Sequence, residues 1–162
     1  MSTKHPIPEK DDLLQILAML YGDALKLDKG SAIPTDDASK CMVAVYVNDN
    51  NEPVTACICN HEFIAFAGAA LTMIPAGGAQ DAAKSGDFSE MMLGNHHEIM
   101  NICSRVFMKT SNAPHLKLDK IYSKPAELPD GVKPIVLESA GRADFTVTIP
   151  GYGDGAMSFL CT

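Results

Sequence analysis

The stretch from Asp87 to Met108 is the longest segment of the sequence that combines helical periodicity with the absence of proline. Ser85 and Gly86 interrupt what precedes it, Asp87 can cap a helix, and Glu90 follows at the spacing of a capping box. At about 100° per residue, the segment divides into a wide apolar arc and an opposite, more polar arc. The sequence therefore predicts one long helix over 87–108 with one buried and one exposed face.

The two arcs of this predicted helix differ in chemistry. The buried arc holds Phe88, Met92, Leu93, His96, Ile99, Met100, Cys103, Val106 and Phe107. The exposed arc holds Asp87, Met91, Gly94, Glu98, Asn101, Ile102 and Arg105. Glu98 and Asn101 are three residues apart, so their side chains are neighbours on one face. A carboxylate, an amide and a guanidinium with apolar side chains beside them favour a docking surface over a merely solvated face.

The chain before this helix predicts a polar arm, one helix and a β-hairpin. The arm covers residues 1–10, and the helix runs from Asp11 to Leu27 with a leucine-rich stripe. The hairpin pairs strands over 41–47 and 53–59 through an asparagine-rich turn. The apolar segment 62–74, after a turn at Asn60 and His61, is interpreted as a strand with a helix as the alternative, and 79–85 as one helical turn or more.

The chain after the helix predicts a polar break over 109–114 and then only strands. The strands are expected over 115–123, 134–139, 143–149 and 156–161. Three glycines between the last two strands are interpreted as a hairpin turn, because no lysine and no following helix support a phosphate loop. The pattern predicts a single α+β domain over 11–162, with an antiparallel sheet of about six strands and two long helices packed on one face.

Composition excludes several classes of protein. A length of 162 residues suits one domain, and a net charge of −7 argues against nucleic-acid binding. Five cysteines without a Cys-x-x-Cys pair, and an N-terminus without a secretory segment, predict reduced thiols and a cytoplasmic location. The longest apolar run, from Phe63 to Pro75, is too short to span a bilayer, so no membrane partner is expected.

Two clusters of metal-binding or redox residue types have simpler interpretations. His96, His97 and Glu98 invite a metal site, but the His-Glu-x-x-His spacing is absent and His96 falls on the buried arc; metal binding stays an alternative. Cys57 and Cys59 alternate within a predicted strand, which favours core packing over redox chemistry.

The Glu98-x-x-Asn101 motif resembles the signature of the CheC/CheX/FliY phosphatases, which dephosphorylate the chemotaxis response regulator CheY. The string from Phe88 to Ile102 and the order of elements over 11–161 carry the resemblance. The first predicted helix lacks the pair, so the chain most resembles CheX or a CheC-like protein with one site. One departure is Gly94, where the family usually has aspartate or serine.

The resemblance implies a catalytic pair and a partner. Asn101 would orient the attacking water, and Glu98 would contact the lysine of a phosphorylated CheY-like receiver. The receiver would supply Mg²⁺, so the chain would need no cofactor or metal of its own. We expect Met91, Gly94, Ile102 and Arg105 to contact the partner. By analogy with CheX, the protein would be a homodimer in a cytoplasmic chemotaxis or other two-component pathway. The alternative from another class is a non-catalytic receiver-binding module or dimeric signalling scaffold.

Overall fold

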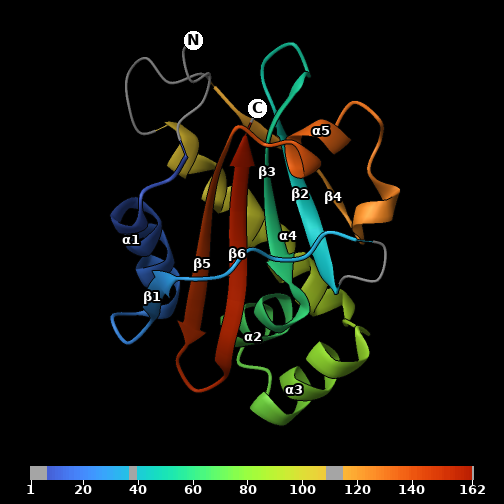
Figure 1. Cartoon of the computed structure of the whole chain (residues 1–162). Coiled ribbons are helices and arrows are strands. Elements are labelled where there is room, and N and C mark those ends of the chain that lie inside the picture. Colours follow the sequence, from blue (N-terminus) through green and yellow to red (C-terminus); the bar gives the residue numbers. More distant parts are fainter. Residues whose placement is uncertain (1–6, 37–39, 109–114, 162) are drawn as a thin grey trace.

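The computed structural model describes residues 7–36, 40–108 and 115–161, and its centre is a six-stranded sheet (Figure 1). All paired strands are antiparallel, in the spatial order β1-β5-β6-β3-β2-β4. The strands are β1 (Lys26–Lys29), β2 (Cys41–Val47), β3 (Pro53–Asn60), β4 (Lys117–Tyr122), β5 (Gly141–Ile149) and β6 (Gly153–Cys161). The predicted α+β class with an antiparallel sheet of about six strands is therefore confirmed.

Helices cover one face of this sheet, and a short helix packs on the other. The helices are α1 (Lys10–Tyr21), α2 (His61–Leu71), α3 (Ala76–Ser85), α4 (Glu90–Cys103) and α5 (Lys133–Leu137), with 3-10 turns η1 (Ser104–Met108) and η2 (Pro125–Glu127). Side chains of α1, α2 and α4 share one core cluster with Cys57 and Phe159, whereas α5 packs with Ile58 and Leu160 on the opposite face. In Figure 1, α4 runs behind the central strands.

The β2–β3 hairpin forms where the sequence predicts it. Strand β2 has the predicted bounds, and β3 is one residue longer than predicted. The side chain of Asn48 closes the turn, because its Oδ1 accepts hydrogen bonds from the backbone N–H groups of Asn50 and Glu52. Both strands are central and covered on both sides, which explains a run of consecutive buried residues rather than strict alternation.

The predicted first helix is too long at its C-terminal end. Helix α1 ends at Tyr21 because Gly22 adopts a φ of 86°, a left-handed conformation that favours glycine. Leu27, which fits the helical stripe, instead points inward from the edge strand β1, and Leu25 is buried just before that strand. Residues 1–6 of the predicted arm lie outside the described residues, as does the predicted break over 109–114.

The segment 62–74 is a helix, so its interpretation as a strand is wrong. Helix α2 begins directly after Asn60, whose Oδ1 accepts a hydrogen bond from the N–H of Phe63. The predicted turn at Asn60 and His61 is thus a helix start. The same oxygen accepts from the N–H of Ala156, which ties the cap to β6. The apolar run is buried because α2 contacts the sheet as well as the neighbouring helices α3 and α4.

The predicted strand over 134–139 is also wrong. Residues Lys133–Leu137 form the short helix α5, with Pro134 in its first turn, where the missing N–H costs nothing. Ile135 and Val136 are both buried against the sheet. The remaining predicted strands form with shifted ends, and the helical turn predicted over 79–85 is the longer helix α3. The glycine-rich segment forms the β5–β6 hairpin turn, as predicted.

Helix α2 packs so closely on β6 that Gly155 has no room for a side chain. A Cβ there would collide with the backbone of Phe63 and lie 2.6 Å from its Cβ. We predict that Gly155→Ala lowers the free energy of unfolding by about 2–3 kcal/mol, because neither backbone can yield cheaply. Urea unfolding measures the change.

Gly131→Ala is the matched control for this substitution. Nothing lies within 4 Å of a Cβ built at Gly131, so the expected change is below about 0.5 kcal/mol. Equal stabilities of the two variants would show that the close approach of α2 to β6 is not a packing constraint.

Candidate functional site

Helix α4 starts three residues later than the sequence predicts. Ser89, not Asp87, is its cap: Ser89 Oγ accepts a hydrogen bond from the N–H of Met92 at 3.2 Å. The predicted capping box is therefore absent, and Glu90 is the first helical residue. The helix continues to Cys103 and then tightens into the 3-10 turn η1, so the predicted segment 87–108 is helical for most of its length.

Contacts with α2 determine which side of α4 faces solvent. A Cβ at Gly68 would lie 3.1 Å from the carbonyl oxygen of Met92, so the two helices approach closely at this glycine. Asn95 Nδ2 donates to the carbonyl of Gly68 at 2.8 Å and lies 3.1 Å from Thr72 Oγ1. The sequence pattern does not predict this role of Asn95; its one signal is an amide at the border between the two arcs of the helix.

The buried side of α4 agrees with the predicted arc at most positions. Met92, His96, Ile99, Met100 and Cys103 are buried, whereas Leu93 is 41% exposed, so its assignment to the core is wrong. Val106 and Phe107 extend the buried side into η1.

The predicted site residues lie on α4, except Arg105, which lies in the following turn η1. Glu98, Asn101 and Arg105 are exposed, as are Gly94 and Met91, whereas Ile102 is half-buried against the core. The described part of the chain contains no side-chain hydrogen bond or ion pair of Glu98 or Asn101. A carboxylate and an amide one turn apart are thus open to an incoming molecule. Their catalytic role, and the partner contacts of their neighbours, stay predictions.

Gly94 leaves a position without a side chain on this face of the helix. Nothing lies within 4 Å of a Cβ built there, and its φ does not require glycine. Packing within the described chain therefore does not explain this glycine. Its effect is on the shape of the outer surface, where it leaves the helix backbone accessible next to Glu98.

The three residues of the alternative metal site do not converge. His96 is 1% exposed and points into the core, where its ring lies edge-on to Phe63, whereas His97 and Glu98 are exposed. Among the described residues, no group of three histidine, cysteine or acidic side chains is arranged to hold a metal ion. Cys57 and Cys59 are both fully buried with their sulfurs 3.8 Å apart, which agrees with core packing.

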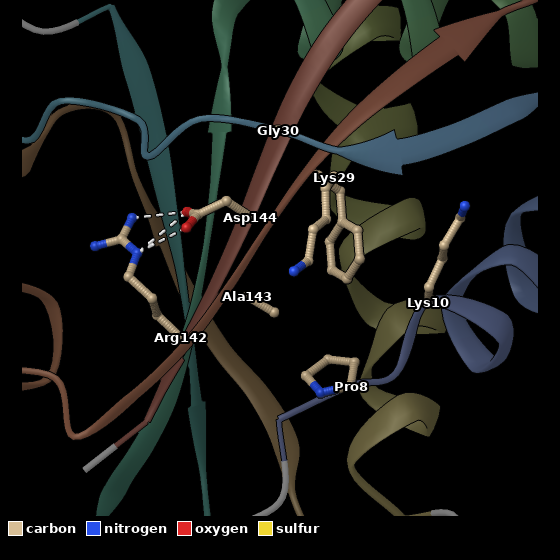
Figure 2. Close-up of a pocket in the computed structure, with 8 residues that line it drawn as sticks. Pro8, Lys10, Lys29, Gly30, Arg142, Ala143 and Asp144 are labelled. Atoms are coloured by element: carbon tan, nitrogen blue, oxygen red, sulfur yellow. Dashed lines mark hydrogen bonds and ion pairs between the residues drawn. The ribbon is translucent and has the colours of Figure 1, made fainter.

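A cavity of about 760 Å³ lies away from α4, at the sheet edge between the start of α1 and the strands β1 and β5 (Figure 2). Figure 2 shows Arg142 and Asp144 together on one side of β5, and Pro8, Lys10 and Lys29 on the other. Burial alone would raise the pKa of Asp144, but hydrogen bonds from Arg142 and Ser158 bring it below its usual value. This carboxylate is committed to an internal ion pair, and the sequence analysis predicted no site here.

Comparisons with known proteins place the fold. No family model matches the chain, and no curated protein matches its sequence. Solved structures do match, among them the FliM–SpeE complex from H. pylori (10% identity, 94% of this chain and 80% of that one, TM-score 0.61) and FliY from Thermotoga maritima (12%, 93% and 82%, 0.60). The CheX–CheY–BeF3–Mg²⁺ complex from Borrelia burgdorferi matches at 12% identity over 93% of this chain and 92% of that one, with a TM-score of 0.57.

These matches define a class: the chain has an α+β fold that is shared by flagellar and chemotaxis proteins. Within that class, the structure confirms the resemblance to the CheC/CheX/FliY proteins at the level of the fold. FliM has the same fold. No helix in the described part of the chain has the length and apolar character needed to cross a membrane.

The buried His96 makes stability depend on pH. Burial lowers the pKa of His96 from 6.5 to about 3, so the folded protein keeps it neutral while the unfolded chain binds a proton below pH 6.5. The unfolded state then holds more protons, so stability falls as pH decreases from about 6.5, by up to about 1.4 kcal/mol per pH unit.

We predict that His96→Leu removes this part of the slope. Urea unfolding of wild type and variant between pH 5 and 7 measures it, in a window where carboxyl groups contribute little. Parallel slopes for the two proteins would show that His96 is protonated, or solvated, in the folded state.

Proposed function

We propose that this protein is a phosphatase that accelerates hydrolysis of the aspartyl phosphate of a CheY-like response regulator. The observation that carries the proposal is the exposure of Glu98 and Asn101, side by side on the outer face of α4 and without a described partner. The fold shared with CheX and FliY supports it.

The chemistry of the reaction suits these two side chains. Hydrolysis of an acyl phosphate requires a water in line with phosphorus, and positioning that water supplies much of the catalysis. The amide of Asn101 offers both a donor and an acceptor on a short side chain, so it can orient a water. Glu98 can form a charge-assisted hydrogen bond with a lysine of the receiver and thereby set the register of docking. Mg²⁺ would come with the receiver.

The surrounding face fits a protein partner of this kind. Gly94 leaves the helix backbone accessible, and Met91, 56% exposed, offers apolar contact beside the polar line. Arg105 lies one turn beyond Asn101 and can meet acidic groups of the receiver. The match to a complex in which CheX is solved with CheY, BeF3 and Mg²⁺ supports a receiver as the partner. We further propose a homodimer acting in a cytoplasmic chemotaxis or other two-component pathway; light scattering tests its mass.

The first prediction concerns Asn101. Asn101→Ala should reduce the acceleration of dephosphorylation by about 100-fold, because it removes the amide that would orient the water. A CheY receiver is phosphorylated with a small-molecule phosphodonor and Mg²⁺, and phosphate release is followed with and without the protein. Gln80→Ala, which removes an exposed amide from α3, is the control and should retain full activity. Activity of Asn101→Ala equal to that of the control would exclude this mechanism.

The second prediction concerns Glu98. Glu98→Ala should weaken binding of the phosphorylated receiver about tenfold, since it removes one charge-assisted hydrogen bond. Calorimetry with a BeF3-loaded receiver measures the affinity without turnover. Glu90→Ala, at the exposed start of the same helix, is the matched control and should bind as wild type. If both variants bind equally, Glu98 does not contact the partner.

A second candidate function is a non-catalytic receiver-binding module or dimeric scaffold. Gly94 favours it, because the position where CheC-like motifs usually have aspartate or serine carries no polar group. The match to FliM also favours it, because FliM is solved in complexes with SpeE and with FliG. Calorimetric binding of the receiver without any acceleration of phosphate release would select this candidate over the phosphatase.

A further inference from the structure

We propose that Tyr46, a buried residue of β2, is a positioning residue for Asn101. Tyr46 would hold Asn101 in position by fixing the peptide group that immediately precedes it. The inference rests on the proposed function, since it concerns how the fold holds the side chain that orients the water.

The contact runs from the centre of the sheet to the backbone of α4. The hydroxyl of Tyr46 donates a hydrogen bond of 2.6 Å to the carbonyl oxygen of Met100, and Tyr46 has no exposed surface. Its ring is held by an edge-on contact with Phe107, at a centroid distance of 5.0 Å. Burial raises the pKa of Tyr46 well above its ordinary value, so the hydroxyl stays a donor in neutral and mildly alkaline solution.

The contact falls where the helical hydrogen-bond pattern changes. In a continuing α-helix the Met100 carbonyl would accept from the N–H of Ser104. Here the N–H of Ser104 donates to the carbonyls of Asn101 and Ile102, and the chain enters η1. The Tyr46 hydroxyl thus satisfies a carbonyl at a helix end, where carbonyls commonly lack a partner within the helix.

A second hydroxyl holds the other side of Asn101. Ser104 Oγ donates a hydrogen bond of 2.7 Å to the carbonyl oxygen of Asn101. The peptide groups before and after Asn101 are therefore each fixed by a side-chain hydroxyl, one from the sheet and one from the next turn. The side chain of an exposed asparagine at a fraying helix end would move with its backbone. The backbone that carries Asn101 is held in place by the two hydrogen bonds. Catalysis by positioning requires that the catalytic side chain deviates from its productive position by well below 1 Å.

The chain contains a matched control for this contact. Tyr21 also donates its hydroxyl to a helix carbonyl, that of Ala67 in α2, at 2.8 Å. Tyr21→Phe and Tyr46→Phe each remove one tyrosine hydroxyl and its hydrogen bond to a helix carbonyl. Only Tyr46→Phe does so next to Asn101. A loss of stability is therefore expected in both variants, and a loss of catalysis in one.

The experiment measures kcat and KM for phosphate release from a phosphorylated CheY receiver, at a temperature where circular dichroism shows all variants folded. Tyr46→Phe should lower kcat about tenfold with KM unchanged within about twofold, because the docking face is intact. Ser104→Ala should lower kcat in the same way, and Ser104→Thr, which retains the hydroxyl, should restore it. Tyr21→Phe should retain the wild-type kcat.

The results separate this inference from the proposed function. If Asn101→Ala abolishes activity but Tyr46→Phe and Tyr21→Phe have the same kcat, only the positioning role of Tyr46 is wrong. A rise of KM with unchanged kcat in Tyr46→Phe would also overturn it, because it would place the effect in docking. If Asn101→Ala is as active as wild type, or wild type itself shows no acceleration, the proposed function fails and this inference fails with it.

Discussion

The close contact between α2 and α4 is the constraint on which the candidate site depends. Gly68 allows the backbones to approach until a Cβ there would be 3.1 Å from the Met92 carbonyl, and Asn95 fixes the rotation of α4 by bonding to the Gly68 carbonyl. Because one side of α4 is held against α2, the opposite side, which carries Glu98 and Asn101, must face the solvent. Exposure of the pair thus follows from packing on the far side of the helix.

Burial of His96 next to the exposed pair has the same origin. Neutral imidazole is accepted in the core, with Nδ1 lacking a described hydrogen-bond partner. That arrangement lowers the free energy of unfolding at acidic pH. It also means that His96 cannot take part in a reaction at the surface. The solvent side of the helix therefore presents a carboxylate and an amide, with the exposed His97 beside them and the guanidinium of Arg105 in the following turn η1. A carboxylate beside an amide can hold and orient a water, which fits a reaction whose electrophile and metal arrive with the partner.

The sequence predicts best where the local pattern and the tertiary environment agree. The β2–β3 hairpin and the two faces of α4 were predicted nearly residue by residue, because a valine-rich run followed by turn residues favours a hairpin and a clear 3.6-residue period favours a helix. Segment 62–74 has no clear period, since α2 is surrounded by other elements, and an apolar run of that kind suits a buried strand equally well. β1 was missed because Leu27 extends the stripe of α1 in helical register, and only the left-handed Gly22 interrupts it. The tie from Tyr46 to Met100 joins residues far apart in the chain, so no local pattern could reveal it.

The fold and the proposed activity depend on opposite faces of one helix, α4. The residues that bury α4 must stay apolar and well packed for the sheet to be covered. Glu98, Asn101 and Gly94 make no described contacts that the fold requires, so they can be exchanged with little effect on stability. In this chain, the proposed phosphatase and the alternative scaffold would therefore differ by a few surface side chains on one fold. That separation fits the observation that FliM, FliY and CheX share the fold of this chain at identities of only 10–12%.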